Sequence, residues 1–148
     1  GAEYHAGKRP WGVTADLAMP CATQNEILEN DAQTMLSNGI IAVSEGANMP
    51  TVIEGIHHFL TAKILFAPAK AANAGGVGMS GLEMSQNSER RSWSNEELSK
   101  MLRDLMIGIH KNCNEAGMQE DGWCNYMAGS NIAGFKKVAD AMMAFGVV

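Results

Sequence analysis

The chain has 148 residues, of which 46% are hydrophobic and 18% charged, and its 11 basic and 16 acidic side chains give a net charge of −5. This length suits one domain with a hydrophobic core, and the apolar fraction excludes a disordered segment. The mildly acidic balance argues against a nucleic-acid-binding surface, and no run of apolar residues is long enough to span a membrane. The three cysteines form no Cys-x-x-Cys pair, which favours a reducing cytoplasm over a disulfide framework or a zinc site.

The first half of the chain alternates short apolar runs with stretches long enough for helices. The apolar runs predict three strands, at residues 13–19, 40–44 and 64–67. The stretches between them predict two helices, at residues 26–37 and 51–62. Thr51 and Glu54 have the spacing of a capping box at the start of the second helix. This alternation predicts an α/β fold with parallel strands joined by right-handed crossovers.

The second half of the chain predicts helices only. Ser94 and Glu97 form another capping-box pattern, and the apolar residues after them recur at helical spacing as far as a stop at Gly117. A last helix carries apolar residues from Ile132 onward and ends at Gly146. A sheet of three parallel strands needs helices on both faces and neighbours at its edges, so we expect a piece of a larger α/β protein.

A literal G-x-G-x-x-G motif stands at residues 76–81. A dinucleotide-binding fingerprint needs these glycines directly after a strand, with an acidic residue about 20 residues later, at the end of the next strand. The nearest predicted strand ends at Ala67, and no strand is expected further on. The motif is therefore better interpreted as a glycine-rich helix start, where a ligand or another backbone can approach closely.

Other residues that could carry chemistry have simpler explanations. The adjacent His57 and His58 point about 100° apart on a helix and cannot share a metal ion, so we expect no metal site. Cys21 follows the first strand, where a ligand-facing loop belongs, but without a histidine partner it is interpreted as a buried thiol. Core filling is expected for four methionines on the apolar stripes: Met101, Met106, Met142 and Met143.

Polar residues follow each of the three predicted strands. They are Thr23, Gln24 and Asn25 after the first, Asn48 after the second, and Lys70 and Asn73 after the third. In an open parallel sheet, ligands bind beyond the carboxyl ends of the strands, and amide side chains that both donate and accept suit a carboxamide or a ribose. Capping of turns and helices explains these residues equally well, so both interpretations stay open.

Five blocks of the sequence, in order and with the expected spacing, carry a resemblance to a known family. They are PCATQNE (20–26), EGANMPT (45–51), FAPAKAANAGG (66–76), SGLEMSQN (80–87) and NIAGF (131–135). Together they resemble the carboxyl-terminal part of the hexameric, NADP-type glutamate dehydrogenases. The resemblance implies the second half of a Rossmann-like parallel sheet followed by a helical carboxyl-terminal extension. It predicts a partial nucleotide-binding α/β region over residues 8–90 and a helical segment over residues 91–148.

The resemblance also implies roles for residues in these blocks. Ser80 would donate its hydroxyl to the side-chain carboxylate of glutamate or 2-oxoglutarate, and Val77, one helical turn earlier, would pack against the substrate's methylene groups. Asn48 and Asn73 would lie where the nicotinamide ribose meets the substrate.

The coenzyme, NADP or NAD, would pass beside the main chain of Cys21 and Ala22. The parent enzyme implied by the resemblance is a homo-oligomer that acts on glutamate, 2-oxoglutarate and ammonium. Its glycine fingerprint, catalytic lysine and catalytic aspartate would lie upstream, so no catalytic residue is predicted here and the chain is expected to be inactive alone.

Two alternatives stay open: a non-catalytic assembly module that binds no ligand by itself, and a related dehydrogenase for an apolar amino acid. Ser80 argues against the second, because an apolar pocket gains nothing from a hydroxyl donor.

Overall fold

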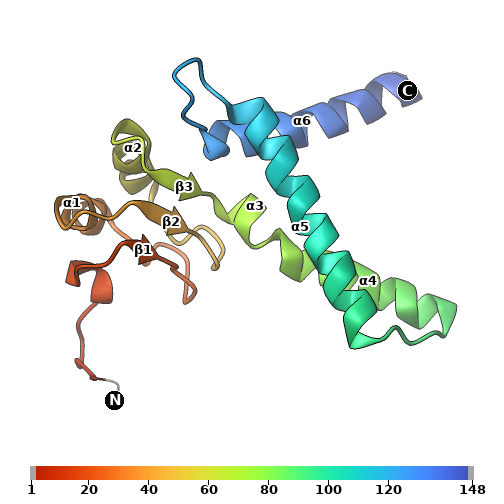
Figure 1. Ribbon diagram of the computed structural model, residues 1–148, viewed down its shortest axis with the longest axis horizontal. Helices are drawn as coiled ribbons and strands as arrows, with labels where there is room; N and C mark the ends of the chain where they lie inside the picture. The colour runs from red at the N-terminus through yellow and green to blue at the C-terminus, as the bar shows by residue number, and fades with distance from the viewer. Residues whose placement is uncertain (1–2, 147–148) are drawn as a thin grey trace.

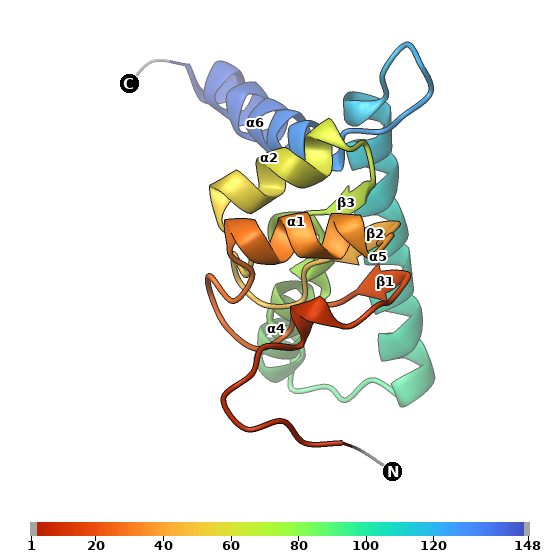
Figure 2. The same ribbon diagram turned by 90° about the vertical axis from the view of Figure 1, so that its left-hand side faces the viewer.

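The computed structural model describes residues 3–146, which form a three-stranded parallel sheet and six α-helices (Figure 1). The strands lie in the order β1 (Leu17–Ala18), β2 (Ala42–Ser44) and β3 (Leu65–Ala67). Helices α1 (Glu29–Ser37) and α2 (Ile53–Thr61) connect them and cover one face of the sheet, as Figure 2 shows. The predicted α/β class and the three parallel strands are confirmed.

Four further helices follow the sheet. They are α3 (Ala69–Ala72), α4 (Ala74–Glu89), α5 (Asn95–Gly117) and α6 (Tyr126–Phe145). The long helix α5 packs against α4 at one end and against α6 at the other (Figure 1). None of the helices described is both long and apolar enough to cross a membrane.

The strands are shorter than predicted, for reasons that lie in the backbone. The predicted strand at residues 13–19 is reduced to β1, and its first residue, Val13, instead closes a short 3₁₀ helix, η1 (Pro10–Gly12), by donating its N–H to the carbonyl of Pro10 (2.9 Å). β2 starts late because the N–H of Ile40 still donates to the carbonyl of Met35 and closes the end of α1 (3.1 Å). The third strand agrees with its prediction to within one residue.

The two predicted capping boxes have different outcomes. At α5, the N–H of Ser94 donates to Glu97 Oε2 (2.8 Å) and the N–H of Glu97 donates to Ser94 Oγ (3.2 Å), which confirms the box predicted there. The box at Thr51 and Glu54 is wrong: α2 begins at Ile53 and has no side-chain cap. Thr51 is instead held in an isolated parallel bridge with Ile27 before the helix starts. The predicted ends of α5 and α6, at Gly117 and Gly146, are confirmed.

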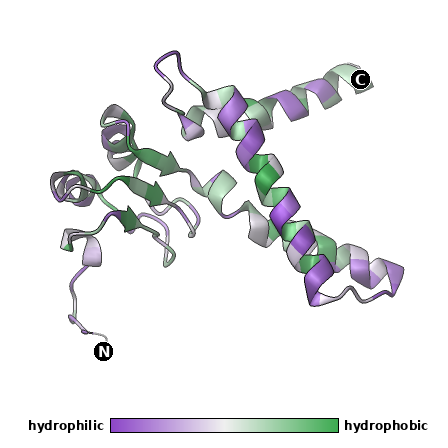
Figure 3. Cartoon of the chain, viewed as in Figure 1, coloured by the Kyte–Doolittle hydropathy of each residue, from purple (hydrophilic) through white to green (hydrophobic). Residues whose placement is uncertain are grey.

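The hydrophobic core lies between the sheet and the pair α1 and α2. It consists of Ile27, Ala32, Met35, Ile40, Val43, Ile56, Phe59 and Phe66. The rings of Phe59 and Phe66 stack with their centroids 5.8 Å apart, and the strands stand out as hydrophobic in Figure 3. On the other face of the sheet, Leu17 and Leu65 share a register and are each 55% exposed. Within residues 3–146 the sheet is therefore fully packed on one face only.

Helix α6 differs from expectation. Its apolar side chains were expected to be buried, yet Met142 is 67% and Met143 83% exposed. The second half of α6 extends beyond its crossing with α5 and away from the sheet (Figure 1). Core filling is thus wrong for these two methionines, whereas Met101 and Met106 on α5 are half-buried.

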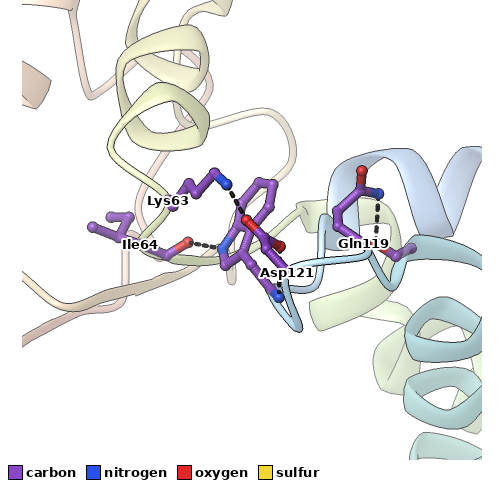
Figure 4. Close-up of polar contacts among 6 residues, drawn as sticks. Lys63, Ile64, Gln119 and Asp121 are labelled. Atoms are coloured by element: carbon purple, nitrogen blue, oxygen red, sulfur yellow. Dashed lines mark hydrogen bonds and ion pairs between the residues drawn. The ribbon is translucent and has the colours of Figure 1, made fainter.

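The loop between α5 and α6 is attached to the start of β3 (Figure 4). Lys63 forms an ion pair with Asp121, and the indole N–H of Trp123 donates to the carbonyl of Ile64 (3.3 Å). The hydrogen bond from Lys63, together with one from the N–H of Trp123, lowers the pKa of the Asp121 carboxyl. These contacts fix the α5–α6 turn against the sheet.

A candidate ligand site at the carboxyl ends of the strands

The loops that follow β1 and β2 lie side by side. The N–H groups of Gly46 and Ala47 both donate to the carbonyl of Pro20, at 3.0 and 2.9 Å. A Cβ at Gly46 would lie 2.5 Å from the Sγ of Cys21, so the two loops approach each other closely at this glycine. Cys21 itself is exposed, and the prediction of a buried thiol is wrong because its loop runs along the open end of the sheet. The neighbouring Ala22 is also exposed.

Asn73, at the junction of α3 and α4, reaches the loop that follows β2. Its Nδ2 donates to Oδ1 of Asn48 (2.9 Å) and lies 3.2 and 3.3 Å from the carbonyl oxygens of Gly46 and Ala47. Asn48 is exposed and Asn73 half-buried. The structure therefore brings together Cys21, Ala22, Asn48 and Asn73 at one edge, where their amide and main-chain groups can both donate and accept hydrogen bonds.

Glu45 is a residue at this edge that the sequence analysis missed. It directly follows β2, is only 3% exposed, and its carboxylate accepts from the N–H of Thr51 (Oε1, 3.3 Å) and of Ala69 (Oε2, 2.8 Å). Its own N–H donates to the carbonyl of Ala67 (3.0 Å). The signal that was available is a charged residue immediately after an apolar strand, because such a carboxylate must find donors inside the protein.

Val77 and Ser80 lie on the side of α4 that faces away from α5. Val77 is 75% exposed, and Ser80 is exposed with its hydroxyl donating to the carbonyl of Gly76 (3.3 Å). Ser80 follows Asn73 by seven residues, which corresponds to about 10 Å along a helix axis. The structure does not bring Ser80 into contact with the Asn48–Asn73 pair but places it on α4, about two turns beyond Asn73.

The G-x-G-x-x-G motif lies inside α4, and no strand follows it in the part of the chain that the structure describes. A Cβ at Gly78 would lie 2.1 Å from Cδ2 of Leu105, and one at Gly75 would lie 2.9 Å from Cδ1 of Leu102. These glycines let α5 pack closely on α4. The interpretation as a dinucleotide-binding fingerprint is thus excluded by the order of the elements.

Several other titratable side chains lie in surface networks or are buried beside the helices. Between residues 3 and 146, no three His, Cys, Asp or Glu side chains are grouped so that they could hold a metal ion. His58 on α2 contacts Glu29 Oε1 (3.0 Å) and Gln33 Nε2 (3.1 Å), a surface network. Burial raises the pKa of the Cys113 and Cys124 thiols, which lie between α5 and α6.

Comparison with known proteins agrees with this arrangement. Residues 1–146 match the family described as Glutamate/Leucine/Phenylalanine/Valine dehydrogenase. The chain belongs to this family. It is 57% identical over 147 residues to the NAD(P)-specific glutamate dehydrogenase of Xylanibacter ruminicola, covering 99% of this chain and 33% of the relative. It is 50% identical over 148 residues to the NAD-specific glutamate dehydrogenase of Bacteroides fragilis, covering 100% of this chain and again 33% of the relative.

Solved structures of family members have the same fold. The glutamate dehydrogenase of Plasmodium falciparum superposes with a TM-score of 0.93 at 42% identity, covering 99% of this chain and 32% of that one. This chain thus spans about a third of the length of the family members it matches. The three-stranded sheet, its two covering helices and the helices that follow are accordingly one part of a larger dehydrogenase fold.

Proposed function

We propose that this chain is the carboxyl-terminal part of a glutamate dehydrogenase, an oxidoreductase that converts L-glutamate, water and NAD(P)⁺ reversibly to 2-oxoglutarate, ammonium, NAD(P)H and a proton. Residues 8–90 are the second half of its Rossmann-like coenzyme domain, and residues 91–148 are a helical extension. The observation that carries the proposal is the Asn48–Asn73 contact at the carboxyl ends of the strands, where ligands bind in open parallel sheets. The similarity to curated glutamate dehydrogenases supports it.

The coenzyme half of the site uses the loops after β1 and β2. The main chain of Cys21 and Ala22 borders the coenzyme, and the amides of Asn48 and Asn73 bind at the nicotinamide ribose. The exposed position of Asn48 and the loop contact through Pro20 and Gly46 support this assignment. When bound, the nicotinamide ring supplies the hydride acceptor for the α-carbon of glutamate.

The substrate half of the site uses α4. Ser80 donates its hydroxyl to the side-chain carboxylate of the substrate, and Val77 packs against the substrate's methylene groups. Both side chains are exposed on one side of α4. Holding the two reactants in register is an orientation effect that can be worth roughly 7–11 kcal/mol in an assembled site.

The proposal assigns this chain only part of a site. It covers a third of its relatives, and the exposed face of its sheet is suited to packing against the rest of the enzyme, or against other subunits of a homo-oligomer such as a hexamer. We expect no glutamate-dependent formation of NADPH by the chain alone, because the general acid and base lie elsewhere. The coenzyme is NAD or NADP, since relatives of similar identity are named NADP-specific and NAD-specific.

The test is Ser80→Ala in the complete enzyme. Hydrogen bonds to charged groups are worth roughly 1.5–3 kcal/mol, so KM for glutamate and 2-oxoglutarate should rise about 10- to 150-fold, with little change for the coenzyme. Val77→Ala is the control and should have a smaller effect, through lost apolar contact alone. If Ser80 only bonds its own helix, as its contact with Gly76 allows, both KM values will stay within about twofold. Faster turnover of leucine or phenylalanine than of glutamate would favour the apolar-substrate alternative.

A further inference from the structure

We propose that Glu45 is a positioning residue: its buried carboxylate sets the relative placement of Asn48 and Asn73. The inference rests on the proposed function for what the two amides bind, but the positioning itself is a property of this chain. The side chain of Glu45 does not reach the exposed edge, because the residue is only 3% exposed. It can therefore act on a ligand only through other residues.

The surroundings of Glu45 explain how a charged group is stable there. None of the ion pairs formed by residues 3–146 includes it. Its two oxygens instead each accept a backbone N–H, from Thr51 at 3.3 Å and from Ala69 at 2.8 Å. Hydrogen bonds to an ionised acceptor are about twice as strong as neutral ones, and a buried carboxylate without them would be strongly destabilising.

These two bonds act on the two segments that carry the amides. Thr51 closes the loop of residues 45–51, and Asn48 lies in the middle of that loop. Ala69 is the first residue of α3, and one turn later the N–H of Asn73 donates back to the carbonyl of Ala69 (3.0 Å). One oxygen thus fixes the loop of Asn48, and the other fixes the helical turn that ends at Asn73.

The chemistry at this position requires two acceptors. A glutamine offers one carbonyl oxygen and one NH₂ group, so Glu45→Gln places a donor against one of the two N–H groups. Glu45→Asp keeps both acceptors on a side chain one methylene shorter. We expect the first variant to break one bond outright and the second to weaken both.

The experiment uses the complete enzyme that contains this chain, with Glu54→Gln as the matched control, since Glu54 is an exposed carboxylate on nearby α2. Hydrogen exchange followed by mass spectrometry should become faster in Glu45→Gln for peptides that span residues 46–52 and 68–74, and stay unchanged in Glu54→Gln. KM for the coenzyme should rise about threefold to tenfold, as expected if one neutral hydrogen bond between the amides of Asn48 and Asn73 and the coenzyme is lost. The kcat of correctly folded enzyme should change less than twofold, and Glu45→Asp should give a smaller rise in KM.

The outcomes separate the positioning role from the proposed function and from a general loss of structure. Partial unfolding would lower the apparent kcat with KM unchanged, and would contradict the inference. Unchanged exchange in both peptides would overturn it as well. Faster exchange with an unchanged KM would support the positioning role but contradict the binding of coenzyme by Asn48 and Asn73. If Glu45→Gln does not fold, Glu45→Asp must still show raised KM and faster exchange, and unchanged values would overturn the proposal.

Discussion

Between Pro20 and Pro68 the chain holds the largest of its fully buried side chains, among them Phe59, Phe66 and Val43, whereas α4, α5 and α6 contribute none to that set within residues 3–146. In the helical part, the buried residues are small: Cys113, Gly117, Cys124, Gly129 and Ser130. The α/β part is thus held together by apolar side chains. The helices are held by close approach of backbones and by loop contacts such as that in Figure 4.

The two regions therefore differ in how far their own contacts cover their apolar side chains. The α/β part has its own core, and its loops are arranged by hydrogen bonds within the region. Helix α6 instead exposes an apolar stripe that is typical of a surface covered by another part of a protein or by a partner. The stripe consists of Ile132, Phe135, Val138, Met142, Met143 and Phe145.

The same substitution in the two regions gives the largest expected contrast. Phe59→Ala removes a fully buried ring that stacks on Phe66, and should lower the free energy of unfolding by about 3–5 kcal/mol. Phe135→Ala removes a ring that is 72% exposed, and should change it by less than about 0.5 kcal/mol. Urea denaturation of both variants measures the contrast, and equal losses would show that the two regions do not differ in this way.

A glycine pair on α6 tests the close approach of the helices. A Cβ at Gly129 would lie 2.0 Å from the carbonyl oxygen of Cys113, so Gly129→Ala should force α5 and α6 apart and cost about 1–3 kcal/mol. At Gly134, a Cβ would have no neighbour within 4 Å, so Gly134→Ala should instead stabilise the helix by about 0.5–1 kcal/mol. Thermal unfolding of the two variants should therefore shift in opposite directions, and shifts of the same sign would contradict the packing described.

The smallest expected effect concerns the Lys63–Asp121 pair, which is exposed to solvent. Its hydrogen bond lowers the pKa of Asp121, so the pair stabilises the fold above the ordinary carboxyl pKa of about 3.9. That contribution is lost as the pH falls through the lowered value. Asp121→Asn should lower Tm slightly at pH 7, and the difference from the unmodified chain should vanish in acid. A difference in Tm that persists or grows in acid would contradict a stabilising Lys63–Asp121 ion pair.

The order of the elements could be predicted from the sequence, because alternating apolar runs and helical stretches define parallel strands whose ends share one edge. That edge also explains why Asn48 and Asn73, predicted at the ends of two different strands, lie together. The exposure of Cys21 and Met143 could not be predicted, because residue type does not say which surface the fold covers.

Hydrogen bonds between residues far apart in the sequence likewise could not be predicted from local patterns. The donors to Glu45 lie 6 and 24 residues away, and no spacing rule connects them. The capping box at Thr51 failed for the same reason, since the N–H of Thr51 is bound by Glu45 before α2 begins. Local patterns predict the helices and strands, whereas tertiary contacts of this kind set the geometry of the site.

We propose that the exposed edge after β1 and β2 borders the coenzyme, and the thiols of the chain allow a direct test of this contact. Cys21 is exposed at that edge, whereas Cys113 and Cys124 are buried with raised pKa values and serve as internal references. In the complete enzyme, iodoacetamide should alkylate Cys21 first, and saturating NADPH should slow that reaction at least about tenfold. An alkylation rate of Cys21 that is unchanged by bound NADPH would contradict the account.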